Sequence, residues 1–192
     1  MQVIFSAPGA SELYAWNLPL TASFEDISGF GKIRFGEKKK VERSFDISLD
    51  KKNIWRVSGK GVKIDFGKNM LKVICPSGIH WSNLRCRIIA GMERGEEAVY
   101  TVTLRGKGKG HLAAGWFDNG GALIGNKHSG TKFVLSEKPR TFTAKFQLPI
   151  EYEQKGAAHF YPDIFIVHPG GELIVEKAAL KIVPLKNKGT VR

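Results

Sequence analysis

Apolar and polar residues alternate strictly in two segments in the second half of the chain. In residues 100–105 (Tyr-Thr-Val-Thr-Leu-Arg) every second side chain is apolar, and residues 141–148 repeat the pattern with Phe142, Ala144, Phe146 and Leu148. A period of two places the apolar side chains on one face of a β-strand and the polar ones on the other. The alternation therefore predicts strands with one buried face, and it strongly constrains the fold class.

Turn-forming residues separate a series of such segments. Gly-rich or Asn-rich turns occur at residues 58–61, 67–69, 119–121 and 169–171. Strands of this length, broken by such turns, predict an all-β fold built as an antiparallel β-sandwich, because βαβ units would need intervening helices. We expect strands near residues 41–47, 54–57, 62–66, 70–75, 84–89, 98–105, 112–118, 131–135, 141–148, 159–167 and 172–182.

The chain is long enough for one substantial core. Its 192 residues are 42% hydrophobic, which favours a folded globule. We expect a lead-in segment at residues 1–22, a single β-sandwich domain at residues 23–184 and a basic tail at residues 185–192. The apolar runs are too short to span a membrane. Residues 1–5 do not resemble a signal peptide, so either the protein is not exported, or this chain has lost its signal or belonged to a larger polypeptide.

The chain carries 30 Lys and Arg against 18 Asp and Glu, a formal net charge of +12. Such an excess indicates affinity for polyanions. Its distribution argues against nucleic acid, because the run Lys38–Lys40 is bracketed by Glu37 and Glu42, and no basic recognition helix is evident. We interpret most of this charge as solvated surface.

Two cysteines, Cys75 and Cys86, flank a segment that is typical of a loop between two antiparallel strands. Both share the parity of apolar neighbours in their strands. Two interpretations stay open: a disulfide that clips the loop in an oxidising compartment, or two buried, reduced thiols.

Four motifs in order give the chain a resemblance to a known family. They are Phe24-Glu25, a Gly-turn-Tyr strand at residues 95–100, an aromatic-Asp-x-x-Gly hairpin at residues 116–121, and a Gly-Gly turn before the last strand at residues 170–171. The chain resembles carbohydrate-binding modules of the family 4/9 kind, which have a galactose-binding-like jelly roll. The resemblance implies a non-catalytic module that binds a glycan outside the cell or at its surface.

The resemblance also implies a structural calcium ion. In such modules a carboxylate of the first strand and one of the final strand bind the ion, and the matching positions here are Glu25 and Glu176. The family usually has Asp where this chain has Glu176. Calcium needs six to eight oxygen ligands, and the alternative interpretation is two exposed carboxylates at strand ends.

A basic, hydroxyl-rich surface is predicted from the polar faces of three expected strands. Arg85 and Arg87 come from the first strand. Thr101, Thr103 and Arg105 come from the second, and Thr141, Thr143, Lys145 and Gln147 from the third. If these strands share one sheet, Trp81 and Trp116 could offer indole platforms to sugar rings beside them. The alternatives are an ordinary solvated sheet face and a Trp116 that belongs to the core.

No catalytic motif supports an enzyme. The sequence lacks G-x-S-x-G, H-E-x-x-H and the phosphate-binding loop motif, and it lacks the R-x-E-x-R and Q-x-H patterns of jelly-roll polysaccharide lyases. We therefore expect a non-catalytic module for a polysaccharide, with an acidic one favoured by the net charge. The other hypotheses are a structural or assembly protein, in which residues 1–20 would pair with a neighbour, and, less favoured, a lyase.

Overall fold

The computed structural model describes residues 40–78, 81–87, 90–167 and 171–185, together with the backbones of four short strands nearer the N-terminus. Contacts within the chain divide it into two units, Met1–Val41 and Glu42–Arg192. This division falls later in the chain than the predicted domain start at residue 23. That boundary and the predicted tail lie largely outside the described residues and stay predictions.

The first unit contains two antiparallel strand pairs. Strand β1 (Val3–Phe5) pairs with β2 (Leu13–Ala15), and β3 (Ala22–Ser23) pairs with β4 (Arg34–Phe35). The second unit contains every other strand of the chain that the structure describes.

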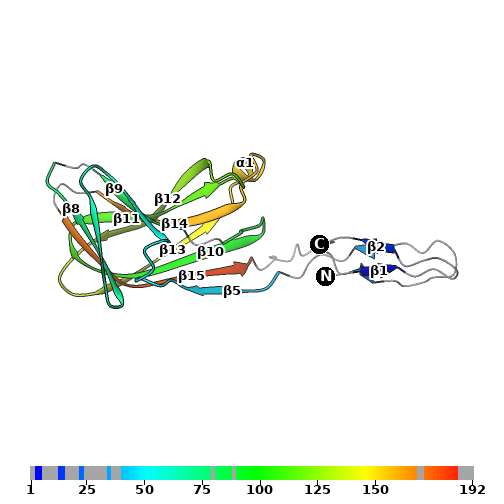
Figure 1. Cartoon of the computed structure of the whole chain (residues 1–192), viewed down its shortest axis with the longest axis horizontal. Helices are drawn as coiled ribbons and strands as arrows, with labels where there is room; N and C mark the ends of the chain where they lie inside the picture. Colours follow the sequence, from blue (N-terminus) through cyan, green and yellow to red (C-terminus); the bar gives the residue numbers. More distant parts are fainter. Residues whose placement is uncertain are drawn as a thin grey trace, which may run out of the picture. The chain divides into compact units, whose positions relative to one another are not determined.

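One layer of the second unit is a six-stranded antiparallel sheet (Figure 1). Its strand order is β13-β10-β15-β8-β7, and β5 also pairs with β15, which is 14 residues long. The strands are β5 (Arg43–Asp46), β7 (Lys63–Gly67), β8 (Met70–Cys75), β10 (Glu96–Lys107), β13 (Arg140–Gln147) and β15 (Gly171–Pro184).

The other layer is a five-stranded antiparallel sheet in the order β12-β11-β14-β9-β6. Figure 1 shows β11, β12 and β14 lying across from β10, β13 and β15. The strands are β6 (Trp55–Ser58), β9 (Ser82–Cys86), β11 (Lys109–Phe117), β12 (Leu123–Val134) and β14 (His159–Ile166). The predicted antiparallel β-sandwich is therefore confirmed.

The core lies between the two sheets and follows the predicted alternation. Tyr100, Val102 and Leu104 of β10 are buried, as are Ala144 and Phe146 of β13. Each expected strand from residue 41 to residue 182 has a counterpart in the structure. The period of two thus identified the inward faces correctly.

Two elements differ from expectation. Strand β12 begins at Leu123, eight residues before the predicted strand, because pairing with β11 holds a segment that has no alternation of its own. A single helical turn, α1 (Ile150–Glu153), follows β13 and was not predicted. No helix within the described ranges is long and apolar enough to cross a membrane.

The two cysteines are buried and are not joined in a disulfide. Cys75 belongs to β8 and Cys86 to β9, so they lie in different sheets. Burial raises the pKa of Cys75 above its usual value, although Ser82 lowers it through a hydrogen bond. The sequence left open either a disulfide or two buried, reduced thiols, and the structure agrees with the buried thiols.

Candidate functional site

The outer face of the five-stranded sheet collects polar and aromatic side chains. Register pairing places His111 of β11 beside Phe165 of β14, and Phe165 beside Asn83 of β9. The next row joins Ala113, Asp163 and Arg85 across the same strands. Because alternate residues of a strand share one face, these side chains form a continuous surface opposite the core.

A buried ion pair lies at the centre of this face. Arg85 Nε donates to Asp163 Oδ1 at 2.8 Å, and Arg85 Nη2 donates to Asp163 Oδ2 at 2.7 Å. This two-pronged geometry holds the planar guanidinium in one orientation. Asp163 is 2% exposed, and its burial raises the pKa of the carboxyl, while the hydrogen bonds and charge of Arg85 oppose that rise.

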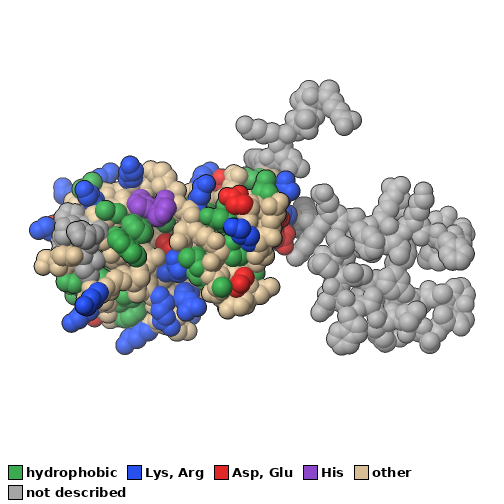
Figure 2. Space-filling model, turned by 90° about the horizontal axis from the view of Figure 1, so that it is seen from above, with side chains coloured by type: hydrophobic (Ala, Val, Ile, Leu, Met, Phe, Trp, Pro, Cys, Tyr) green, Lys and Arg blue, Asp and Glu red, His purple; other side chains and the backbone are tan. Residues whose placement is uncertain are grey.

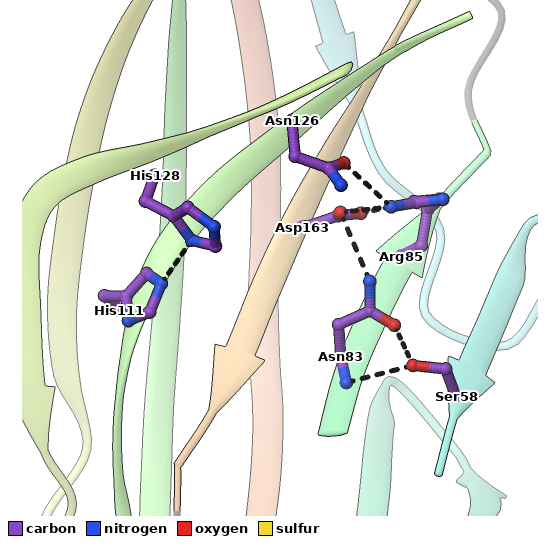
Figure 3. Close-up of polar contacts among 7 residues, drawn as sticks. All are labelled: Ser58, Asn83, Arg85, His111, Asn126, His128 and Asp163. Atoms are coloured by element: carbon purple, nitrogen blue, oxygen red, sulfur yellow. Dashed lines mark hydrogen bonds and ion pairs between the residues drawn. The ribbon is translucent and has the colours of Figure 1, made fainter. Parts of the chain in front are cut away.

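Amide and hydroxyl groups extend the ion pair to both sides (Figure 3). Asn126 Oδ1 accepts from Arg85 Nη2 at 3.4 Å, and Asn83 Nδ2 donates to Asp163 Oδ2 at 3.4 Å. Ser58 donates its hydroxyl to Asn83 Oδ1. We call these five residues the polar network. It supplies fixed planar donors and acceptors on strands β6, β9, β12 and β14.

A row of rings runs beside the polar network. Trp81 stacks on Phe165 with centroids 5.7 Å apart and planes 8° apart, and His111 stacks on Phe165 at 4.8 Å. His128 meets both His111 and Phe165 edge-on. We call these four residues the aromatic row. In the space-filling view of this side, histidine side chains lie next to a hydrophobic patch (Figure 2).

Small residues at the centre of the outer face leave it without large side chains. Ala113 and Gly115 occupy the outward positions of β11 between the two ends of the sheet. A Cβ at Gly115 would lie 2.9 Å from the Phe117 ring and 3.3 Å from Arg85 Nη2. The absence of a side chain at residue 115 leaves room for the guanidinium, whose Cζ lies 4.8 Å from the Phe117 ring centroid.

The structure separates the residues that the sequence predicted as one surface. Trp81, which is 53% exposed, and Arg85 belong to the face just described, and Arg87 is exposed directly after the end of β9. Thr103 and Arg105 belong to β10 in the other sheet. The assumption that these strands share a sheet was wrong, because alternation reports the face of a strand and not the sheet that contains it.

The residues of the six-stranded sheet already have partners. Thr103 shares a hydrogen bond with Thr141 at 3.0 Å, and Arg105 Nε donates to Glu176 Oε1 at 2.5 Å. Trp116, in contrast, belongs to β11 of the five-stranded sheet, where it is 1% exposed and packs on Phe160 in the core. It therefore offers no ring face to a ligand, and the platform interpretation of Trp116 is wrong.

The predicted calcium ligands gain no support from the geometry. Glu25 lies outside the described residues, and the carboxylate of Glu176 is held by Arg105. No cluster of three or more His, Cys, Asp or Glu side chains that could hold a metal ion occurs in the described part of the chain. The calcium site stays a prediction, because its other carboxylate, Glu25, lies outside the described residues.

Sequence reasoning missed most of the site. A usable signal existed in β14, where Asp163 interrupts an apolar strand and shares its parity with Phe165. A charged residue within such a strand indicates a paired, functional position. No signal marked Asn126 or His128, because the first half of β12 has no alternation.

Comparisons with known proteins give the fold. No family model matches the chain, and no curated protein matches its sequence. Among solved structures, the enzymatically active domain of tailspike protein 4 from bacteriophage CBA120 matches with a TM-score of 0.51 at 13% identity, over 69% of this chain and 20% of that one.

Two bacterial xylanase structures also match. The CBM22-1–GH10 modules of Clostridium thermocellum endo-1,4-β-D-xylanase 10B give a TM-score of 0.53 at 15% identity, over 79% of this chain and 29% of that one. The CBM22-1 domain of Paenibacillus barcinonensis Xyn10C gives 0.52 at 10% identity, over 75% of this chain and 95% of that one. At these identities the likeness concerns the fold alone, which is a β-sandwich jelly roll that the two carbohydrate-binding modules among these structures also have.

Proposed function

We propose that this protein is a non-catalytic module that binds a polysaccharide on the outer face of its five-stranded sheet. The observation that carries the proposal is the exposed indole of Trp81 beside the rigid polar network. Sugars present C–H faces to aromatic rings, and their hydroxyl groups pair with planar groups held in place. The face provides both within one surface.

The similar structures supply a first ligand class. The Clostridium structure was solved with xylohexaose, and the Paenibacillus domain is described as xylan-binding. Xylan is therefore the first polymer to test. A polysaccharide ligand also supports a location outside the cell or at its surface.

Whether the polymer is acidic depends on cations that form no ion pair with a carboxylate in the described part of the chain. The carboxylate of Asp163 balances the positive charge of Arg85, so Arg85 would attract an acidic polymer only weakly. Arg87 and Lys132 are exposed, and Lys132 pairs in register with His111 of the aromatic row. Acidic groups of a polymer would pair with these two side chains, and such contacts would weaken in salt.

Calorimetric titration tests the proposal with soluble xylan, glucomannan and polygalacturonate at low and high salt. We expect Trp81→Ala to abolish binding. Ile74→Ala is the matched control, because Ile74 is 40% exposed on β8 of the other sheet. Arg87→Ala should flatten the salt dependence with an acidic polymer, whereas Arg105→Ala on the six-stranded sheet should leave binding unchanged.

Two outcomes would redirect the assignment. Binding that survives Trp81→Ala but is lost in Arg105→Ala would move the site to the six-stranded sheet and Thr103. Failure of every polymer to bind folded protein at low salt would refute the proposal and favour the assembly hypothesis. We also propose a structural calcium ion with Glu25 and Glu176 as carboxylate ligands. A melting temperature that falls when a chelator is added and recovers with calcium would support it.

A further inference from the structure

A β-bulge brings two histidines together on the proposed binding face. The register pairs His111 with Lys132 and Ala113 with His128, and it shifts between these pairs. Ser129 stabilises the bulge by donating to the Leu112 carbonyl at 2.6 Å. Bulges re-aim side chains, and this one leaves His111 Nε2 only 2.7 Å from His128 Nδ1 (Figure 3).

The two imidazoles form the end of the aromatic row. His111 stacks on Phe165, whose other neighbour in the row is Trp81. A polymer that packs on Trp81 and continues along the row would cover His111 and remove water from it. Removal of water disfavours the charged form of an imidazole.

The groups around His111 favour its neutral form. Burial, His128 and the Lys132 ammonium, in that order, lower the pKa of His111. Strand β14 contributes one carboxylate, Asp163, which interacts with His128 but is neutralised by Arg85 of β9. Asp163 therefore does little to stabilise an imidazolium.

Protonation changes the pair in two steps. In the neutral pair, one ring donates an N–H to the bare nitrogen of the other. A first added proton brings a positive charge to the row. A second places a proton on both facing nitrogens, which removes the hydrogen bond and sets two like charges against each other.

We propose that His111 and His128 extend the binding face and couple it to protons, so that the neutral pair binds neutral polysaccharide and the protonated pair releases it. This inference rests on the proposed function. Each proton that release takes up lowers the affinity by up to about tenfold per pH unit of acidification.

Calorimetric titration of xylan into the full chain at pH 7.5, 6.5, 5.5 and 4.5, at constant ionic strength, tests the inference. The double variant His111→Gln and His128→Asn keeps amide groups near the positions of the two nitrogens but cannot be protonated. His159→Gln is the matched control, since His159 stacks on Tyr161 away from the pair. Circular dichroism at each pH verifies that every variant is folded.

We expect the affinity of the wild-type protein and of His159→Gln to fall at least tenfold between pH 7.5 and 4.5, and that of the double variant to stay constant. Binding by the wild-type protein that is independent of pH overturns this inference alone. An equal fall in the double variant also overturns it. Absence of xylan binding by wild type at every pH overturns the inference, and failure of the other polymers as well overturns the proposed function.

Discussion

The buried ion pair of Arg85 and Asp163 leads to an asymmetric prediction about stability. The Asp163 side chain is 3% exposed and that of Arg85 is 19% exposed. Replacing Arg85 with Met keeps an aliphatic stem on the Phe117 ring but leaves a carboxylate buried without its cation. Replacing Asp163 with Asn leaves a guanidinium that solvent reaches in part.

The two replacements should therefore differ in cost. Breaking a buried pair by removing one partner costs about 3–5 kcal/mol when the remaining charge is fully buried, and we expect this range for Arg85→Met at pH 7. A hydrogen bond lost to a partly hydrated group costs about 1–3 kcal/mol, and we expect this range for Asp163→Asn. The difference follows from the unequal exposure of the two partners.

The dependence on pH separates a charge effect from a packing effect. Burial raises the pKa of Asp163 in the folded state, and Arg85 opposes this rise. In Arg85→Met the pKa rises further, so the folded carboxyl takes up a proton at a pH where the unfolded one remains ionised. Acidification then favours the folded state, and stability is lost as pH rises through the folded pKa. The deficit of Arg85→Met should shrink between pH 7 and pH 5.

Urea unfolding followed by tryptophan fluorescence at pH 7 and pH 5 measures both effects. The wild-type protein supplies the reference at each pH, and Asp163→Asn is the control that has no carboxyl to protonate. Equal losses for the two variants at pH 7 would refute the argument from exposure. A deficit of Arg85→Met that does not shrink on acidification would refute the argument from charge.

Three further predictions concern packing. Phe146→Ala should cost about 3–5 kcal/mol in urea unfolding, because its ring is buried between the sheets; a near-neutral effect would contradict the assignment of faces. Gly115→Ala should cost about 1–3 kcal/mol and weaken xylan binding, since the new Cβ meets the Phe117 ring at 2.9 Å; unchanged stability would show that the ring moves freely. Tyr100→Phe should leave the melting temperature unchanged or raised, because the Tyr100 hydroxyl is buried and has no hydrogen-bond partner among the described residues; a marked fall would contradict this.

Sequence alone predicts the strands that have one solvent-exposed face and one buried face. Strand β13 was placed to within one residue, because Ala144 and Phe146 must be buried while Lys145 and Gln147 must not. Strand β12 was predicted only near its end. It is the last strand of its sheet and much of it is exposed on both faces, so burial imposes no period on it.

The candidate site was harder to predict because it depends on which strands become neighbours. The parity of Arg85 and of Thr103 was read correctly, since both point away from the core. The sheets to which these two residues belong were not predicted correctly, because a strand shows the same alternation in either sheet. The bulge that joins His111 to His128 is set by three-dimensional pairing of β11 with β12, and no local pattern encodes it.

The net charge of +12 is a weak guide to the ligand because pairing divides it unevenly over the surface. Several Lys and Arg side chains that could have bound an acidic polymer already form ion pairs with carboxylates. These pairs are Arg85–Asp163, Arg105–Glu176, Lys72–Glu172, Lys145–Glu97 and Lys181–Glu42. On the proposed binding face the central cation is one of them. The centre of the face is therefore suited to hydroxyl groups, and a preference for acidic polymers would have to come from Arg87 and Lys132 at its edges.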